Sequence, residues 1–421
     1  MRAAALLLLV GCATAAPSVT SLSWRRNGPS AGEPAVYRGP AVAARTLKNG
    51  LTVAVVESDR LPLTALHVVV QVGSADDPSG YEGTAAALGE LLCPGAVVDV
   101  SADAMTFSIT VDGQPSEALA ELARCIQTPE LTALDAAKER LQRRLDAATA
   151  EQELFAAIYP DHPYRHPIAG SADGLARLSP EGLALHHRTH FSPDRTAVIL
   201  AGPVRISEAT EWIQRLWNGN WGEPRAALAA APEPEGQLLF RANPKLGRTL
   251  VFAAAAGLPR AHPDALALLL GSAIVGRQLA VATDAIDLRA GFEFRRGPGP
   301  FRIQAIAETT GSAKVIRQIV RVLDDATVST DELDRARADF RNRLPAQMQT
   351  QEATVGLLGA LFAAGLPLDY FASLPENLAK LDAEDIQRVV RRHLDSERLF
   401  FFVVGDPSIE AAVQSAIARG G

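Results

Sequence analysis

The chain contains one segment twice, and this repeat limits it to folds with two equivalent halves. Residues 175–202 and 378–405 align without a gap, and eight positions, from Leu175 to Gly202, carry the same residue in both copies. Each copy predicts a capped helix, a turn and a buried apolar strand that ends at glycine. A repeat of this length indicates a duplicated domain rather than a solenoid unit.

Apolar runs and turn signals predict further elements in each half. Ser329 and Glu332 form a capping box at the start of an expected helix. Several expected strands follow one another at hairpin spacing, which favours antiparallel pairing. We therefore predict an α+β fold of two homologous halves, each a mainly antiparallel sheet with helices packed on one face. The expected strands are 51–56, 63–72, 249–256 and 301–307, and the expected helices include 132–150 and 329–340.

Length and composition agree with two globular domains. The 421 residues exceed one ordinary core, and a hydrophobic content of 48% with 21% charged residues is typical of a folded protein. The net charge of −7 argues against a nucleic-acid partner. The predicted organisation is a signal segment at 1–16, a flexible tether at 17–40, an N-terminal domain at 41–228, a linker at 229–237 and a C-terminal domain at 238–421.

The first residues predict export. A basic start at Met1 and Arg2 precedes an apolar run, 3–10, that is too short to span a bilayer. The run leads into Leu-Val-Gly-Cys, which resembles a bacterial lipobox with Cys12 as the acylated mature N-terminus. Cleavage after Ala15 is the alternative. Both predict a periplasmic chain, and lipidation predicts an anchor in the outer membrane.

The segment 80–95 resembles a metal-binding helix that has lost its ligands. It is similar to the first active-site helix of the M16 family (pitrilysin, insulinase and mitochondrial processing peptidase), which has the pattern Glu-Gly-Leu-Ala-His-x-x-Glu-His-Leu-Leu. By this resemblance Ala86 replaces the first histidine, Gly89 the general-base glutamate and Glu90 the second histidine. The positions that keep the family frame are Glu82, Gly83, Ala85, Leu91 and Leu92.

These replacements predict that the chain holds no metal and no catalytic residue. A catalytic zinc needs three protein ligands and an open position for water, and neither alanine nor glycine can coordinate it. The family's third ligand would fall near 142–144, where the chain has Gln-Arg-Arg, and Glu139 is the nearby carboxylate. We interpret Glu82, Glu90 and Glu139 as solvated helix carboxylates. Zinc is expected only in a partner subunit.

The second half also departs from active relatives. In the M16 family this half supplies an arginine and a tyrosine that hold substrate, and the matching stretch here, 277–289, has Arg277 and Arg289 but no tyrosine. Arg295 and Arg296 are interpreted as a solvated hairpin end. Before 105–111, the family's usual extra helix and strand are missing. The resemblance extends from Arg45 onward, and motifs at 162–170, 193–194, 297–301 and 365–370 also carry it.

Two further constellations leave alternatives open. Cys93 and Cys125 can pair in an oxidising compartment or remain as buried thiols. His186 and His190 have metal-ligand spacing on one helix face, but such spacing is also common on protein surfaces, and no acidic partner segment is evident.

The resemblance implies the inactive subunit of a heterodimeric zinc peptidase, which would form part of a chamber that binds extended peptide. Its partner would be an active M16 subunit. Two alternatives remain: a stand-alone binding or scaffold lipoprotein, and a divergent active zinc metallopeptidase.

Overall fold

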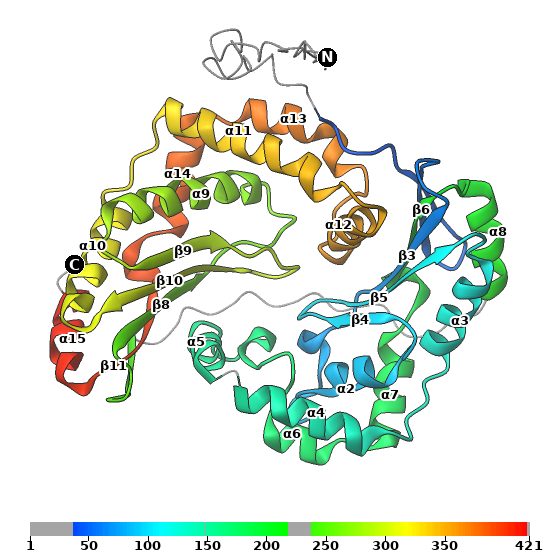
Figure 1. Cartoon of the computed structure of the whole chain (residues 1–421), viewed down its shortest axis with the longest axis horizontal. Helices are drawn as coiled ribbons and strands as arrows, with labels where there is room; N and C mark the ends of the chain where they lie inside the picture. Colours follow the sequence, from blue (N-terminus) through cyan, green and yellow to red (C-terminus); the bar gives the residue numbers. More distant parts are fainter. Residues whose placement is uncertain (1–36, 148, 218–236, 419–421) are drawn as a thin grey trace, which may run out of the picture. The chain divides into compact units, whose positions relative to one another are not determined.

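The computed structural model describes residues 37–147, 149–217 and 237–418, and the two copies of the repeat form matching elements (Figure 1). In the first copy, helix α7 (Pro180–His190) leads to strand β6 (Thr196–Gly202). In the second copy, α14 (Ala383–His393) leads to β11 (Phe400–Gly405). The side chains of Ser179 and Asp382 accept backbone hydrogen bonds at the two helix starts, so the predicted caps are present.

Each half is built on one sheet, and the two sheets have the same strand order apart from one additional strand. The first sheet has the order β1-β2-β6-β3-β5-β4 and the second the order β7-β11-β8-β10-β9. The pairs β2–β6 and β11–β7 are parallel and all other pairs are antiparallel, which confirms the predicted fold class. The remaining strands are β1 (Ala43–Thr46), β2 (Thr52–Glu57), β3 (Leu63–Val70), β4 (Val97–Val100), β5 (Met105–Asp112), β7 (Leu238–Ala242), β8 (Arg248–Ala256), β9 (Asp287–Phe292) and β10 (Pro300–Glu308).

Matching the strands of the two sheets shows which helices of the two halves are equivalent. Helix α2 (Thr84–Leu91) and α9 (Ala265–Ala282) follow the equivalent strands β3 and β8. Helix α4 (Leu134–Ala147) corresponds to α11 (Thr330–Gln347), and α5 (Thr149–Ile158) corresponds to α12 (Gln351–Ala363). The other helices are α3 (Ser116–Gln127), α6 (Ala172–Arg177), α8 (Ile206–Leu216), α10 (Ser312–Asp324), α13 (Tyr370–Lys380) and α15 (Glu410–Ala418).

One helix from each half covers the second face of the other half's sheet. Helix α12 packs on β3 and β6, and α5 packs on β8 and β11. At one crossing, a Cβ atom on Gly359 would lie 2.4 Å from Nε2 of His67, so only glycine allows α12 to approach β3 this closely. Each sheet therefore has helices of its own half on one face and a single helix of the other half on the opposite face.

The predicted element boundaries are corrected at two places. The expected helix 132–150 is two helices, α4 and α5, and the second of them crosses to the other sheet. The expected strand 63–72 ends at Val70. Within the expected tether, the Tyr37 hydroxyl contacts Sδ of Met348 at 3.4 Å and Arg38 forms an ion pair with Glu376.

Candidate functional site

Helix α2, where the family frame predicts the metal ligands, begins with a side-chain cap. The carboxyl group of Asp77 accepts hydrogen bonds from the backbone nitrogens of Gly83 and Ala85, both at 2.7 Å. Burial opposes ionisation of Glu82, but hydrogen bonds from Gly80 and Ser171 hold the pKa of its carboxyl below the usual range. Burial raises the pKa of Asp77 to about 8, so its carboxyl is largely protonated at neutral pH, and these contacts fix the helix start without an exposed charge.

The positions of the first histidine and the general base are closed by packing. Ala86 is buried, with 4% of its surface exposed. A Cβ atom on Gly89 would lie 2.4 Å from Cγ2 of Val100, on the edge strand β4. Because the chain reaches β4 directly after α2, the valines of this strand pack where a glutamate side chain would have to extend.

At the position of the second histidine, an ion-pair cluster takes the place of a metal coordination shell. Oε2 of Glu90 lies 2.5 Å from Nε of Arg140, and Oε1 lies 2.6 Å from Nη2 of Arg144. The Glu90 side chain is only 14% exposed, so its interpretation as a solvated carboxylate is wrong. Two fixed guanidinium groups satisfy this carboxylate, and their charge would repel a metal cation.

The last of the acidic candidates faces elsewhere. Glu139 is exposed on α4, whereas Ala137, Arg140 and Leu141 form the side of this helix toward α2. Within the described ranges, no group of three or more histidine, cysteine, aspartate or glutamate side chains is arranged to hold a metal ion. The arrangement around Ala86, Gly89 and Glu90 therefore supports packing and ion pairing rather than hydrolysis.

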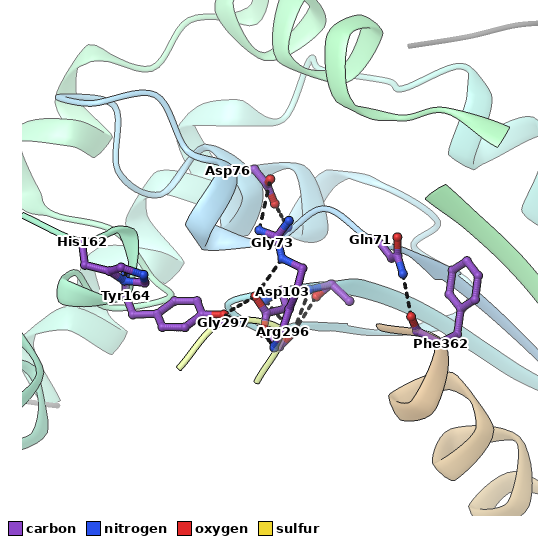
Figure 2. Close-up of polar contacts among 11 residues, drawn as sticks. Gln71, Gly73, Asp76, Asp103, His162, Tyr164, Arg296, Gly297 and Phe362 are labelled. Carbon is purple, nitrogen blue, oxygen red and sulfur yellow. Dashed lines mark hydrogen bonds and ion pairs between the residues drawn. The ribbon is translucent and has the colours of Figure 1, made fainter. Parts of the chain in front are cut away.

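A second polar cluster joins the two halves, and sequence analysis did not identify it (Figure 2). The Tyr164 hydroxyl donates to Oδ1 of Asp103 at 2.6 Å and accepts from the backbone nitrogen of Gly297 at 2.8 Å. The other carboxylate oxygen of Asp103 accepts from the backbone nitrogen of Arg296 at 2.8 Å. Tyr159 adds a hydrogen bond from its hydroxyl to the carbonyl oxygen of Pro298 at 2.7 Å.

This cluster corrects the interpretation of Arg295 and Arg296 as a solvated hairpin end. Their side chains are 10% and 18% exposed, and Arg296 makes ion pairs with Asp76 and Asp103 of the other half. Burial, reinforced by the Asp103 carboxylate, raises the pKa of Tyr164, so the hydroxyl stays protonated and can donate. The motifs at 162–170 and 297–301 thus contact each other and connect the two halves.

Comparisons with known proteins find sequence similarity to M16-related proteins. The sequence profile described as "Peptidase M16 inactive domain" matches residues 177–340. The chain is 28% identical to coenzyme PQQ synthesis protein F of Pseudomonas syringae pv. tomato over 195 residues, which is 39% of this chain. It is 22% identical to the probable mitochondrial-processing peptidase subunit beta of Arabidopsis thaliana over 278 residues, which is 57% of this chain. It spans 25% and 51% of the lengths of these relatives.

A solved structure has the same fold over most of the chain. The peptidase M16 inactive domain from Pseudomonas fluorescens has a TM-score of 0.77 at 22% identity. The match covers 87% of this chain and 98% of that one. The chain is therefore similar to M16 peptidases in sequence over residues 177–340 and in fold over most of its length. The matched profile is that of an inactive domain, and it covers residues 177–340, outside the helix that carries Ala86, Gly89 and Glu90.

The M16 arginine–tyrosine clamp has no counterpart in the stretch 277–289. Arg277 forms an ion pair with Asp339 of α11 at 2.6 Å. Arg289 is 81% exposed and lies 3.7 Å from Asp287. The two arginines therefore contact acidic neighbours of their own half, and no tyrosine accompanies them in this stretch.

The remaining candidate residues make structural contacts. His186 and His190 stack with ring centroids 4.3 Å apart, but His186 is buried, so the alternative of a surface pair is wrong. Helix α7 packs against α2. Cys93 and Cys125 form a disulfide bond between the end of α2 and α3. Cys12 lies outside the described residues.

Proposed function

We propose that this chain is the non-catalytic subunit of a two-chain M16 zinc peptidase and forms part of a chamber that binds extended peptide. The partner subunit supplies the zinc, the general base and the water-activating chemistry. This chain supplies one side of the chamber and no catalytic group.

The observation that carries the proposal is the Glu90 cluster. Arg140 and Arg144 bind the one carboxylate left on the former ligand face, while both sheets and the helices around them are kept. The fold is kept although the position of the metal site is closed. This is the pattern expected if assembly and peptide binding, rather than hydrolysis, were selected. The Arabidopsis thaliana relative is named as a subunit, which supports a multi-chain assembly for this chain.

The chain is also proposed to be an exported lipoprotein, acylated at Cys12 and anchored in the outer membrane. The Cys93–Cys125 bond supports an oxidising compartment, because structural disulfides are rare where thiols are kept reduced. Mass spectrometry of the intact protein would find a diacylglyceryl group on Cys12, and Cys12→Ser would release the protein into the soluble periplasmic fraction. An unmodified N-terminus at Ala16 would support simple cleavage instead.

The assembly is tested by mixing the purified chain with a His-x-x-Glu-His homologue encoded in the same genome. We expect a 1:1 complex in sedimentation velocity and faster cleavage of a quenched fluorescent peptide than the homologue achieves alone. Replacing the general-base glutamate of the homologue with glutamine must abolish turnover of the complex, because this chain contributes no base.

Other outcomes identify the two alternatives. Peptide binding without complex formation would support a stand-alone binding lipoprotein. Chelator-sensitive hydrolysis by this chain alone would support a divergent zinc peptidase and overturn the proposal.

A further inference from the structure

A hollow of about 500 Å³ lies between α9, α11 and β9 in the C-terminal half, and we call it the α9–α11 hollow. Most of the side chains that line it are apolar, and its volume lies within the range of small-molecule sites. Along α9 the lining extends from Leu269 to Ala280, which is a length of about 16 Å. Leu288 of β9 and Phe340 of α11 contribute to the other walls. The hollow is therefore an elongated apolar surface that follows α9.

Helix α9 is more apolar than its burial explains. Its 18 residues have a mean hydropathy of 1.7, a value typical of membrane-spanning helices and of core helices, yet only 50% of the helix is buried. A helix of this composition is normally enclosed on all sides. The unburied part includes Ala273 and Ala280, which border the α9–α11 hollow. An apolar ligand in the hollow would remove this surface from water.

Among the described residues, one cationic side chain that lines the hollow has no partner. Arg343 is exposed on α11 and makes no ion pair or hydrogen bond within the part of the chain that the structure describes. The other two arginines of the lining lie beside carboxylates: Arg277 is 2.6 Å from Asp339, and Arg289 is 3.7 Å from Asp287. Arg343 is therefore the group that can bind an anionic head in this hollow.

Arg343 lies toward the end of the hollow that Leu269 forms. Gln278, near the end of α9, donates to Glu332, at the start of α11, at 2.8 Å. Leu269, near the start of α9, and Arg343, near the end of α11, border the same hollow, so the two helices run in opposite directions. Gln347 follows Arg343 by one helical turn and also lines the hollow. A carboxylate at this end can accept from both side chains while an apolar body extends along α9.

From these observations we propose that the α9–α11 hollow binds a long-chain fatty acid, with its carboxylate at Arg343 and Gln347 and its hydrocarbon chain along α9. A hydrocarbon chain loses no hydrogen bonds when it leaves water, whereas a peptide backbone among apolar side chains would lose them. The unpaired arginine complements the single negative charge of the head. The site does not depend on a peptidase partner and so goes beyond the proposed function.

The test uses the full-length chain with Cys12→Ser, because detergent for an acylated protein would compete for the hollow. Straight-chain fatty acids from octanoate to tetradecanoate are titrated below their critical micelle concentrations by isothermal titration calorimetry. We expect saturable binding whose affinity rises about fourfold for each added methylene until the chain fills the hollow, and then levels off. Dodecyltrimethylammonium, with a similar tail and a positive head, should bind at least about tenfold more weakly than dodecanoate. Equal affinity for these two compounds, or no binding of any fatty acid, would overturn the inference.

Three variants locate the site. Ala273→Trp fills the hollow from an exposed position on α9 and should weaken dodecanoate binding by at least about tenfold. Arg343→Glu should weaken dodecanoate binding by about fivefold and leave the binding of uncharged dodecanol unchanged, because the side chain contacts only the head. Arg341→Glu is the same reversal at an exposed position of α11 outside the lining, and this control should leave binding unchanged. Unchanged dodecanoate binding in both site variants, or an equal loss in the control, would overturn the proposal.

Two results would identify a different occupant and overturn the fatty-acid site. Self-association that Ala273→Trp abolishes, without fatty-acid binding, would identify a second copy of the chain. Binding to phosphatidylglycerol vesicles without binding of monomeric dodecanoate would identify a membrane surface. A chain that binds dodecanoate but forms no peptidase complex would keep this site and overturn only the subunit assignment.

Discussion

Each half has a groove between two helices and the edge strand of its sheet. The groove between α2, α4 and β4 in the N-terminal half is closed, and the groove between α9, α11 and β9 in the C-terminal half is open. In the first half, Val100 packs against Gly89 and the Glu90 cluster bridges α2 to α4. In the second half, Ala290 occupies the edge strand beside Gly276, and a hollow of about 500 Å³ remains. The filled groove lies in the half that carries segment 80–95, which resembles the metal-binding helix of the M16 family.

In the two grooves the acidic and basic partners of the ion pair are exchanged between the two helices. The buried residues Leu134 and Ala137 of α4 match Leu333 and Ala336 of α11, and the same offset aligns Arg140 with Asp339. In the N-terminal half the carboxylate lies on the first helix, and in the C-terminal half it lies on the second. Equivalent helices can thus be connected by an ion pair of either polarity.

The largest expected effect tests whether the stability of the protein depends on the disulfide bond that joins the end of α2 to α3. Cys93→Ala with Cys125→Ala opens a bond that spans 32 residues, and the free energy of unfolding should fall by roughly 3–4 kcal/mol. Urea denaturation of the variant and of the reduced wild type measures this loss. Equal stability of oxidised and reduced protein would show that α2, unlike our account, needs no such connection.

The next effect tests the closure of the N-terminal groove. Gly89→Glu should lower the free energy of unfolding by about 2–3 kcal/mol, because its side chain overlaps Val100. Gly356→Glu is the matched control, since a Cβ atom on this helical glycine meets nothing within 4 Å. Chemical denaturation compares the two, and adding Val100→Ala should restore part of the loss. Equal stabilities for the two glycine variants would contradict the packing argument.

Acid should destabilise the protein through His186, whose counterpart in the repeat is Val389. Burial lowers the pKa of His186 from 6.5 to about 3, so the unfolded chain binds a proton in this interval and the folded chain does not. Stability is therefore lost as the pH falls below 6.5, by about 1.4 kcal/mol per pH unit. Between pH 6.5 and pH 5 the wild type should lose about 2 kcal/mol more than His186→Val. Identical pH profiles from chemical denaturation would contradict this assignment.

The smallest effect compares the ion pairs of the two grooves. Arg140→Ala should lower the free energy of unfolding by about 1–2 kcal/mol, because it removes a partner from a carboxylate that is 14% exposed. Arg277→Ala should lower it by less than about 1 kcal/mol, because Asp339 is 52% exposed. A greater loss for Arg277→Ala in thermal or urea unfolding would reverse the comparison.

Local sequence patterns were sufficient to predict the repeated elements. The repeat predicted α7 with β6 and α14 with β11, and the capping box at Ser329 begins α11 as expected. These features depend on residues a few positions apart, where periodicity and capping act. The sequence did not decide whether Cys93 and Cys125 pair. Pairing depends on the distance between α2 and α3, which spacing along the chain does not give.

Contacts between distant residues were beyond the reach of such patterns. Asp103 and Arg296 are 193 positions apart, and neither has a local signal for its partner. The charge of Arg296 suggested a solvated position, but the side chain makes ion pairs with Asp76 and Asp103 of the other half. The motif positions identified Glu90 as a lost ligand, whereas its ion pairs depend on how α4 lies against α2.

The most direct test of the account is the metal content of the full-length, tag-free protein, purified without chelator and measured by inductively coupled plasma mass spectrometry after equilibration with zinc. We predict far less than one zinc per chain and no peptide hydrolysis by the chain alone, because Arg140 and Arg144 occupy the surroundings of Glu90. One tightly held zinc per chain together with hydrolysis would contradict the account.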